Sequence, residues 1–148
     1  MTLPMPRFYK YFNRTYKLDR KENGNVAGFM LNLWTGGFDE NNRHIDDVLF
    51  AMGEAEISTL NEQRFVQETE IERQHYLRGE GPIFALYETI DGLYEQAGEE
   101  NRRLTAEEVA LVVSLRGRTF RLWEDEFARR AAGEAPSFEV RSILPPER

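Results

Sequence analysis

The chain has 148 residues, of which 41% are hydrophobic, 12% aromatic and 30% charged. Such a composition is typical of one globular domain, since disordered chains carry fewer aromatic residues. The net charge of −7 argues against nonspecific binding to nucleic acid, whose phosphates need clustered lysine and arginine. The absence of cysteine excludes disulfides, thiol nucleophiles and cysteine-ligated metals.

The beginning of the chain has no apolar core of the kind that signal peptides carry. No apolar run reaches the roughly 18 residues that a membrane-spanning helix needs. We therefore expect a cytoplasmic protein that does not contact a membrane.

Aromatic residues near the start of the chain recur at helical spacing, and they are Phe8, Tyr9, Phe12 and Tyr16. They predict a short amphipathic helix over residues 7–17 with a basic outer face. Residues 19–25 contain Asn23-Gly24 and predict a turn, which we expect to join two helices rather than the strands of a β-hairpin. From Val26 the apolar spacing predicts a second helix that ends at Gly36-Gly37.

The middle of the chain contains two further apolar patterns. Ile45, Val48, Leu49 and Met52 predict a helix that Asn41 or Asn42 caps and that ends near Gly53. Thr59 and Glu62 match a capping box, which predicts a helix over residues 60–77. Because this helix is strongly acidic and has few apolar positions, we expect it to lie at the surface.

The second half of the chain carries the clearest helix signals. Pro82 suits the first turn of a helix, and an apolar stripe extends that helix to about Gly98. Thr105 and Glu108 form a second capping box, and they predict a long central helix over residues 105–132. Residues 138–141 alternate as an extended segment within a tail over residues 136–148.

These elements predict an all-α fold: a single-domain bundle of about five or six helices over residues 1–148, with a short extended C-terminal segment. No internal repeat or second domain is indicated.

No known catalytic motif occurs in the sequence. The serines lie outside nucleophile elbows, and no glycine-rich phosphate loop is present. Paired carboxylates alone do not indicate a glycosidase, since any acidic protein contains them. We therefore expect a protein that is not an enzyme and has no cofactor.

A metal-binding enzyme is one alternative. Glu72 and His75 have the Glu-x-x-His spacing of di-iron helical bundles, but that motif occurs once, and His44 is the only other histidine. His44 also lies close to Asp46 and Asp47, whose simpler role is to stabilise a helix start. We favour solvent-exposed polar residues in both places and expect no metal.

A nucleic-acid-binding regulator is the second alternative. The start of the chain combines aromatic residues with a basic set, namely Arg7, Lys10, Arg14, Lys17, Arg20 and Lys21. Pairing of these residues with acidic helices of the same chain explains them more simply, so we expect no direct contact with nucleic acid.

The leading hypothesis rests on the acidic residues. Complementary charge speeds association and orients partners, so a small acidic protein without catalytic motifs suits a basic partner. We expect an inhibitor of the immunity-protein or antitoxin type that neutralises a basic nuclease or another nucleic-acid enzyme. The expected partner-binding residues are Asp39, Glu40, Asp46, Asp47, Glu54, Glu56, Glu62, Glu68, Glu70 and Glu72.

Overall fold

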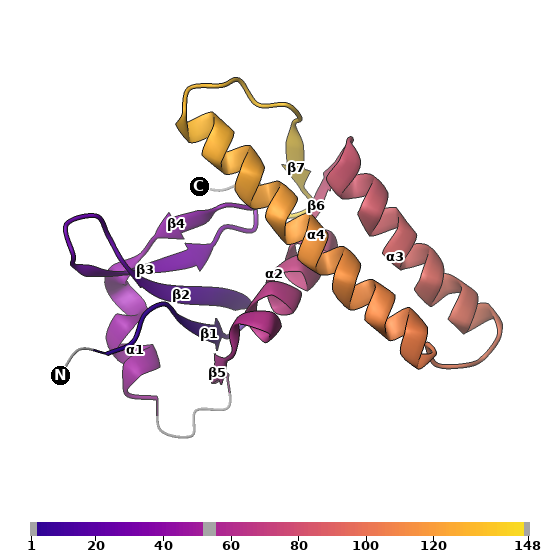
Figure 1. Cartoon of the computed structure of the whole chain (residues 1–148), viewed down its shortest axis with the longest axis horizontal. Helices are drawn as coiled ribbons and strands as arrows, with labels where there is room; N and C mark the ends of the chain where they lie inside the picture. The colour runs from indigo at the N-terminus through magenta and orange to yellow at the C-terminus, as the bar shows by residue number, and fades with distance from the viewer. Residues whose placement is uncertain (1–2, 52–55, 147–148) are drawn as a thin grey trace.

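The computed structural model describes residues 3–51 and 56–146. These residues form a five-stranded antiparallel sheet beside a helical half (Figure 1). The sheet has the strand order β4-β3-β2-β1-β5, and its strands are β1 (Arg7–Tyr11), β2 (Arg14–Arg20), β3 (Val26–Leu31), β4 (Phe38–Glu40) and β5 (Ile57–Leu60). The prediction of an all-α bundle is therefore wrong.

Four α-helices and one 3-10 helix accompany the sheet in the described residues. They are η1 (Asn42–His44), α1 (Ile45–Leu49), α2 (Glu62–Tyr76), α3 (Pro82–Glu99) and α4 (Ala106–Ala131). A separate two-stranded sheet pairs β6 (Leu77–Gly79) with β7 (Val140–Ser142). The segment predicted as an extended tail thus includes a short strand.

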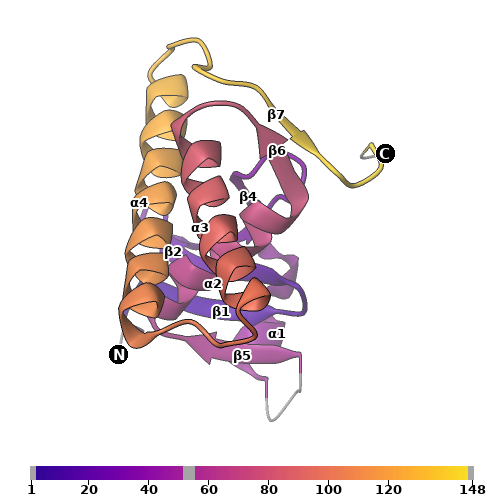
Figure 2. The same cartoon turned by 90° about the vertical axis from the view of Figure 1, so that its right-hand side faces the viewer.

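Helices cover both faces of the large sheet. On one face α2 packs through Phe65, whose ring centroid lies 4.5 Å from that of Phe8. On the other face Val48 of α1 packs with Tyr9 and Tyr16. Next, α4 packs on α2, and α3 packs on α4 at the outer side of the helical half (Figures 1 and 2). None of the described helices is long and apolar enough to cross a membrane.

Residues 7–33 do not form the two predicted helices. Because helices lie on both faces of the sheet, β1 to β3 carry half-buried and buried residues on both sides, which hides the alternation typical of strands. The turn around Gly24 (φ 86°) is confirmed, but it joins β2 to β3 as a hairpin. A Cβ at Gly28 would lie 1.8 Å from the Tyr16 hydroxyl, so this glycine permits close packing within the sheet.

Predicted helix starts differ in accuracy. The Thr105 capping box is confirmed, with the Glu108 amide donating to Thr105 Oγ1 at 3.1 Å. Asn41 caps the 3-10 helix η1 rather than the predicted helix, because α1 has His44 at its N-cap without a side-chain cap hydrogen bond. The last residue of α1 is Leu49, and the expected end at Met52 and Gly53 lies outside the described residues. The capping box at Thr59 is wrong, because Thr59 lies in β5 opposite Tyr9 and Asn61 caps α2 instead.

A buried polar network joins the two halves of the molecule. Glu70 of α2 accepts hydrogen bonds from the Tyr87 hydroxyl of α3 at 2.8 Å and from the Thr119 hydroxyl of α4 at 2.5 Å. Its other oxygen pairs with Arg73 at 2.8 Å, and Arg73 Nε donates to the Gly36 carbonyl, between β3 and β4, at 2.8 Å. Burial and the Glu70 carboxylate raise the pKa of Tyr87 well above its ordinary value, so its phenol keeps the proton that it donates.

A second carboxylate fixes the C-terminal segment onto α4. Glu126, which is 1% exposed, accepts hydrogen bonds from the backbone amide and hydroxyl of Ser137 and from Arg129 and Arg130. Burial by itself raises the pKa of Glu126, but the hydrogen bonds from Ser137, Arg130 and Arg129 outweigh burial and lower the pKa to about 2. These hydrogen bonds hold the segment around Ser137, which precedes β7, against α4.

The buried ion pair should be far more important for stability than an exposed one on the same helix. Replacing Arg73 with Met leaves Glu70 without its cation, and we expect a loss of about 3–5 kcal/mol in the free energy of unfolding. Arg64→Met is the matched control: it removes an ion pair with Glu68 in which Arg64 is 64% exposed, and it should cost less than about 1 kcal/mol. Urea denaturation measures the free energy of unfolding of both variants. Equally small losses in the two variants would contradict the structural role of the buried Glu70–Arg73 pair.

The Glu126 contacts should make stability depend on acid pH. The pKa of Glu126 is about 4.5 in the unfolded chain and about 2 in the fold, so its contribution is complete above about 4.5 and disappears as the pH falls to about 2. We expect Glu126→Gln to have a lower free energy of unfolding than the wild type at neutral pH. The difference between the two should disappear as the pH falls from about 4.5 to about 2. Exposed Glu124→Gln is the control, and a gap that does not change with pH would disprove the idea.

Candidate protein-binding surface

The predicted acidic residues do not form one surface. Asp39 and Glu40 lie on β4, and Asp46 and Asp47 lie on α1, which packs on one face of the sheet. Glu62, Glu68, Glu70 and Glu72 belong to α2, which packs on the opposite face. Glu56 is exposed beside β5, and Glu54 lies outside the described residues.

Several of these carboxylates already have cationic partners. Lys21 lies 3.2 Å from Glu40, and the Asn42 amide together with Lys21 lowers the pKa of that carboxyl. Lys10 of β1 lies 2.8 Å from Glu72 and 3.4 Å from Glu68. The expected pairing of the basic start with an acidic helix is thus confirmed for Lys10.

Glu70 and Asp47 are also engaged within the protein. Glu70 has no exposed surface, because it belongs to the buried network, so it offers nothing to a partner in this structure. Asp47 accepts a hydrogen bond from the Tyr11 hydroxyl at 3.0 Å and lies 3.3 Å from His44 Nδ1. The predicted acidic surface therefore carries less free charge than the sequence indicates.

The residues proposed for a metal site lie apart. Glu72 is bound by Lys10, His44 packs against Tyr11 with ring centroids 4.4 Å apart, and His75 is exposed at the end of α2. The part of the chain that the structure describes contains no group of three or more metal-ligating side chains.

The basic residues at the start of the chain do not lie on the helix that was predicted for residues 7–17 and considered for a nucleic-acid contact. They lie on and beside the strands β1 and β2. These cations also have intramolecular contacts: Arg14 lies 5.6 Å from the Trp34 ring centroid, and Lys17 lies 5.7 Å from that of Phe29. Arg14 and Lys17 thus lie beside aromatic rings of the same protein.

A different acidic surface lies on α3. Glu88, Asp91, Glu95 and Glu99 are all exposed and are spaced three or four residues apart, which aligns them along one side of the helix. We call these four residues the α3 stripe. Within residues 3–51 and 56–146, none of the four makes an ion pair.

The α3 stripe does not help its own helix. Like charges three or four residues apart repel, each such pair costing about 0.2–0.5 kcal/mol. Glu99 also lies at the C-terminal end of α3, where the helix dipole disfavours a negative charge, and α3 contains no lysine, arginine or histidine. The α3 stripe is therefore a row of negative charges that does not stabilise the helix that carries it.

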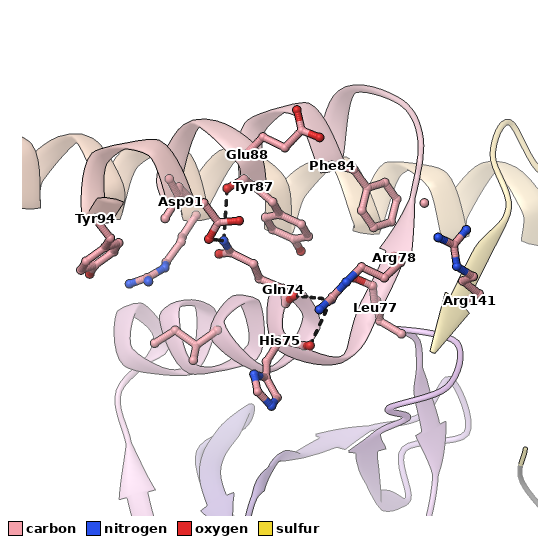
Figure 3. A pocket seen from close by; sticks show the side chains of 14 residues that line it. Gln74, His75, Leu77, Arg78, Phe84, Tyr87, Glu88, Asp91, Tyr94 and Arg141 are labelled. Atoms are coloured by element: carbon pink, nitrogen blue, oxygen red, sulfur yellow. Dashed lines mark hydrogen bonds between the residues drawn. The ribbon is translucent and has the colours of Figure 1, made fainter. Parts of the chain in front are cut away.

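A groove runs beside the α3 stripe, between α2 and α3, and β6 and β7 lie at one end of it (Figure 3). Its volume is about 530 Å³, and Glu88 and Asp91 of the stripe contribute to its wall. Gln74 of α2 donates to Asp91 at 2.8 Å and to the Tyr87 carbonyl at 3.1 Å, which ties the two helices together. We call this feature the α2–α3 groove.

The α2–α3 groove offers both apolar and polar contacts. Tyr94 is 48% exposed and Ile71 38% exposed, so two large side chains at the groove are open to solvent. Arg78 donates to the Gln74 and His75 carbonyls at 3.1 Å and thereby satisfies the end of α2. Exposed aromatic and arginine side chains are the residue types that dominate binding energy at protein interfaces.

The apolar stripe of α3 was predicted from the sequence, but its acidic stripe was not. The signal was available, because Glu88, Asp91, Glu95 and Glu99 recur at helical spacing without an intervening cation. The pairing of Glu68 and Glu72 with Lys10 was not predictable in the same way, since it depends on where β1 lies.

Comparison with known proteins gives no relative: no family model, no curated protein and no solved structure matches this chain.

A basic peptide should distinguish the free carboxylates from the paired ones. An arginine-rich peptide is titrated into the protein at low salt, and binding is followed through the amide chemical shifts of the protein. We expect the shifts of α3 residues to change at the lowest peptide concentrations. Changing Glu88, Glu95 and Glu99 together to Gln should weaken binding about tenfold, since each exposed charge contributes about 0.2–1 kcal/mol.

The matched control is Glu68→Gln with Glu72→Gln, which removes carboxylates that already pair with Lys10 and Arg64. This variant should bind the peptide almost as the wild type does. Perturbations centred on β4 and α1, or a larger loss in the control, would show that α3 is not the preferred surface.

Proposed function

We propose that this protein is a non-enzymatic binding module that covers a basic protein partner with the α3 stripe and the α2–α3 groove. The partner that we propose is a nuclease or another nucleic-acid enzyme, which makes the protein an inhibitor of the immunity-protein or antitoxin type acting in the cytoplasm. The observation that carries the proposal is the α3 stripe, whose four carboxylates lack ion-pair partners among the described residues.

Charge complementarity supports this class of partner. Enzymes that act on nucleic acids carry lysine and arginine for the phosphates, and a row of carboxylates offers these cations an alternative contact. The α3 stripe extends over about 16 Å, given a rise of 1.5 Å per residue, so it suits an extended basic surface rather than a single cation. Its field would speed association and orient the partner.

The α2–α3 groove supports a protein partner rather than a free cation. Exposed Tyr94 and Ile71 provide apolar area that a partner would bury, and burial of this kind supplies affinity that exposed charges alone do not. In this arrangement the carboxylates guide the encounter and the groove residues slow dissociation. Inhibition follows because the partner's phosphate-binding surface is occupied.

Site-specific crosslinking in the source cell tests the proposal. A photo-reactive amino acid at Gly92, which lies between Asp91 and Glu95 and has free space for a side chain, should capture a basic protein. The same amino acid at exposed Gln63 of α2 is the matched control and should not capture it. The captured protein, once purified, should be a nucleic-acid enzyme that stoichiometric amounts of this chain inhibit.

Charge reversal then tests the named residues. Changing Glu88, Asp91 and Glu95 together to Lys should weaken binding to that enzyme about a hundredfold or more, because close charge pairs at such interfaces couple by about 1.5 kcal/mol or more. Equal affinity of this variant, or an enzyme whose activity the chain leaves unchanged, would refute the function.

A further inference from the structure

A second pocket lies on the other side of the helical half, between the sheet and α4. Its volume is about 410 Å³, which falls in the range of small-ligand sites. Residues from β2, β4, α2 and α4 line it, and the phenylalanines among them are Phe38, Phe65, Phe120 and Phe127. Their rings pack on one another, with centroids 5.5 Å apart for Phe38 and Phe65 and 6.2 Å apart for Phe65 and Phe120.

Lys17 brings a cation to this aromatic pocket. Its ammonium lies 5.7 Å from the Phe29 ring centroid and 5.9 Å from that of Phe38. Within the described ranges, Lys17 makes no ion pair and no side-chain hydrogen bond, whereas Lys10 on the same side of the sheet has two carboxylate partners. The Lys17 side chain is half-buried, its ammonium lies beside ring faces, and it has no paired anion among the described residues.

Arg73 provides a second donor in the wall of the pocket. It is 2% exposed, and its guanidinium lies 5.5 Å from the Phe38 centroid and 5.4 Å from the Phe120 centroid. Its hydrogen bonds in the buried network use Nε and one N–H group of Nη1, which leaves Nη2 and the second N–H group of Nη1 as further donors. Because the network fixes this side chain, these donors are held in place before any ligand arrives.

The acidic residues of the pocket are already solvated or bonded. Glu124 is exposed on α4, and Asp39 is exposed on β4, where it accepts a hydrogen bond from Asn32 at 2.7 Å. Neither carboxylate forms an ion pair with Lys17 in the described structure. Lys17 and Arg73, not these carboxylates, are the charged groups that lie next to the phenylalanine rings.

We propose that this pocket binds a small apolar carboxylate, with its hydrophobic body between the phenylalanine rings and its carboxylate at Lys17 and Arg73 Nη2. The aromatic walls exclude water from the body of such a ligand, and the two nitrogens supply charge-assisted hydrogen bonds to its anionic end. An apolar amine is a poorer ligand, because its ammonium group cannot accept hydrogen bonds from Lys17 and Arg73. A small inorganic anion is also a poorer ligand, because it leaves the apolar part of the pocket unfilled. The site is separate from the α3 stripe and does not depend on the proposed function.

Calorimetry with matched probes tests the ligand class. We expect saturable binding of 3-phenylpropionate or decanoate, and at least tenfold weaker binding of 3-phenylpropanamide, 3-phenylpropylamine and acetate. Amide chemical shifts of the wild type should change around Lys17, Phe38 and Phe120. No saturable binding of either carboxylate, equal binding of the amide, or shifts confined to another region would overturn the proposal.

Single substitutions test the assigned contacts. Lys17→Met keeps the aliphatic stem but removes the charge, and it should weaken binding of the carboxylate about tenfold without affecting the amide. Lys21→Met removes a lysine of the neighbouring turn, which pairs with Glu40, and should leave the affinity unchanged. Circular dichroism confirms that each variant is folded, and an unchanged affinity in Lys17→Met would count against the site.

Discussion

The Glu70–Arg73 pair is the interaction on which the rest of the structure depends. It lies on α2, between the sheet and the helices, and its oxygens and nitrogens contact α3, α4 and the β3–β4 connection. Removing two charges from water is costly, and here hydrogen bonds from Tyr87 and Thr119 offset that cost. Such a network favours one arrangement of the elements, because any other arrangement leaves a buried charge without its partners.

The position of this network determines which surfaces are free. Since α2 is held between the sheet and the other helices, Glu70 enters the network, and Glu68 and Glu72 lie near β1, where they pair with Lys10. Because α3 packs at the outer side of the helical half (Figure 2), the carboxylates of the α3 stripe are exposed to solvent, and Asp91 alone of the four accepts a hydrogen bond from α2 in the described structure. The same arrangement places Lys17 and the phenylalanines of β4 and α4 around one pocket. Both candidate sites thus follow from how the two halves pack.

The distribution of charge illustrates why an acidic sequence does not define an acidic surface. The span from Asp39 to Glu72 contains ten acidic residues, but Lys21 and Lys10 pair with some of them from the sheet side of the molecule. The α3 stripe has only four acidic residues, and these make no ion pair in the described part of the chain. A surface charge is available to a partner only when no intramolecular cation has already approached it.

The sequence by itself determined the elements whose signals are local. The bounds of α3 and α4 were predicted closely, because apolar spacing, Pro82 and the Thr105 capping box act within a few residues of one another. The sheet could not be predicted, since Tyr9 and Tyr16 fit a helical spacing as well as they fit a strand, and only pairing between distant segments decides. Likewise, only the tertiary structure decided that Glu70 is buried, Glu72 is paired and Glu95 is free, because charge pairing and burial depend on residues that are neighbours in space.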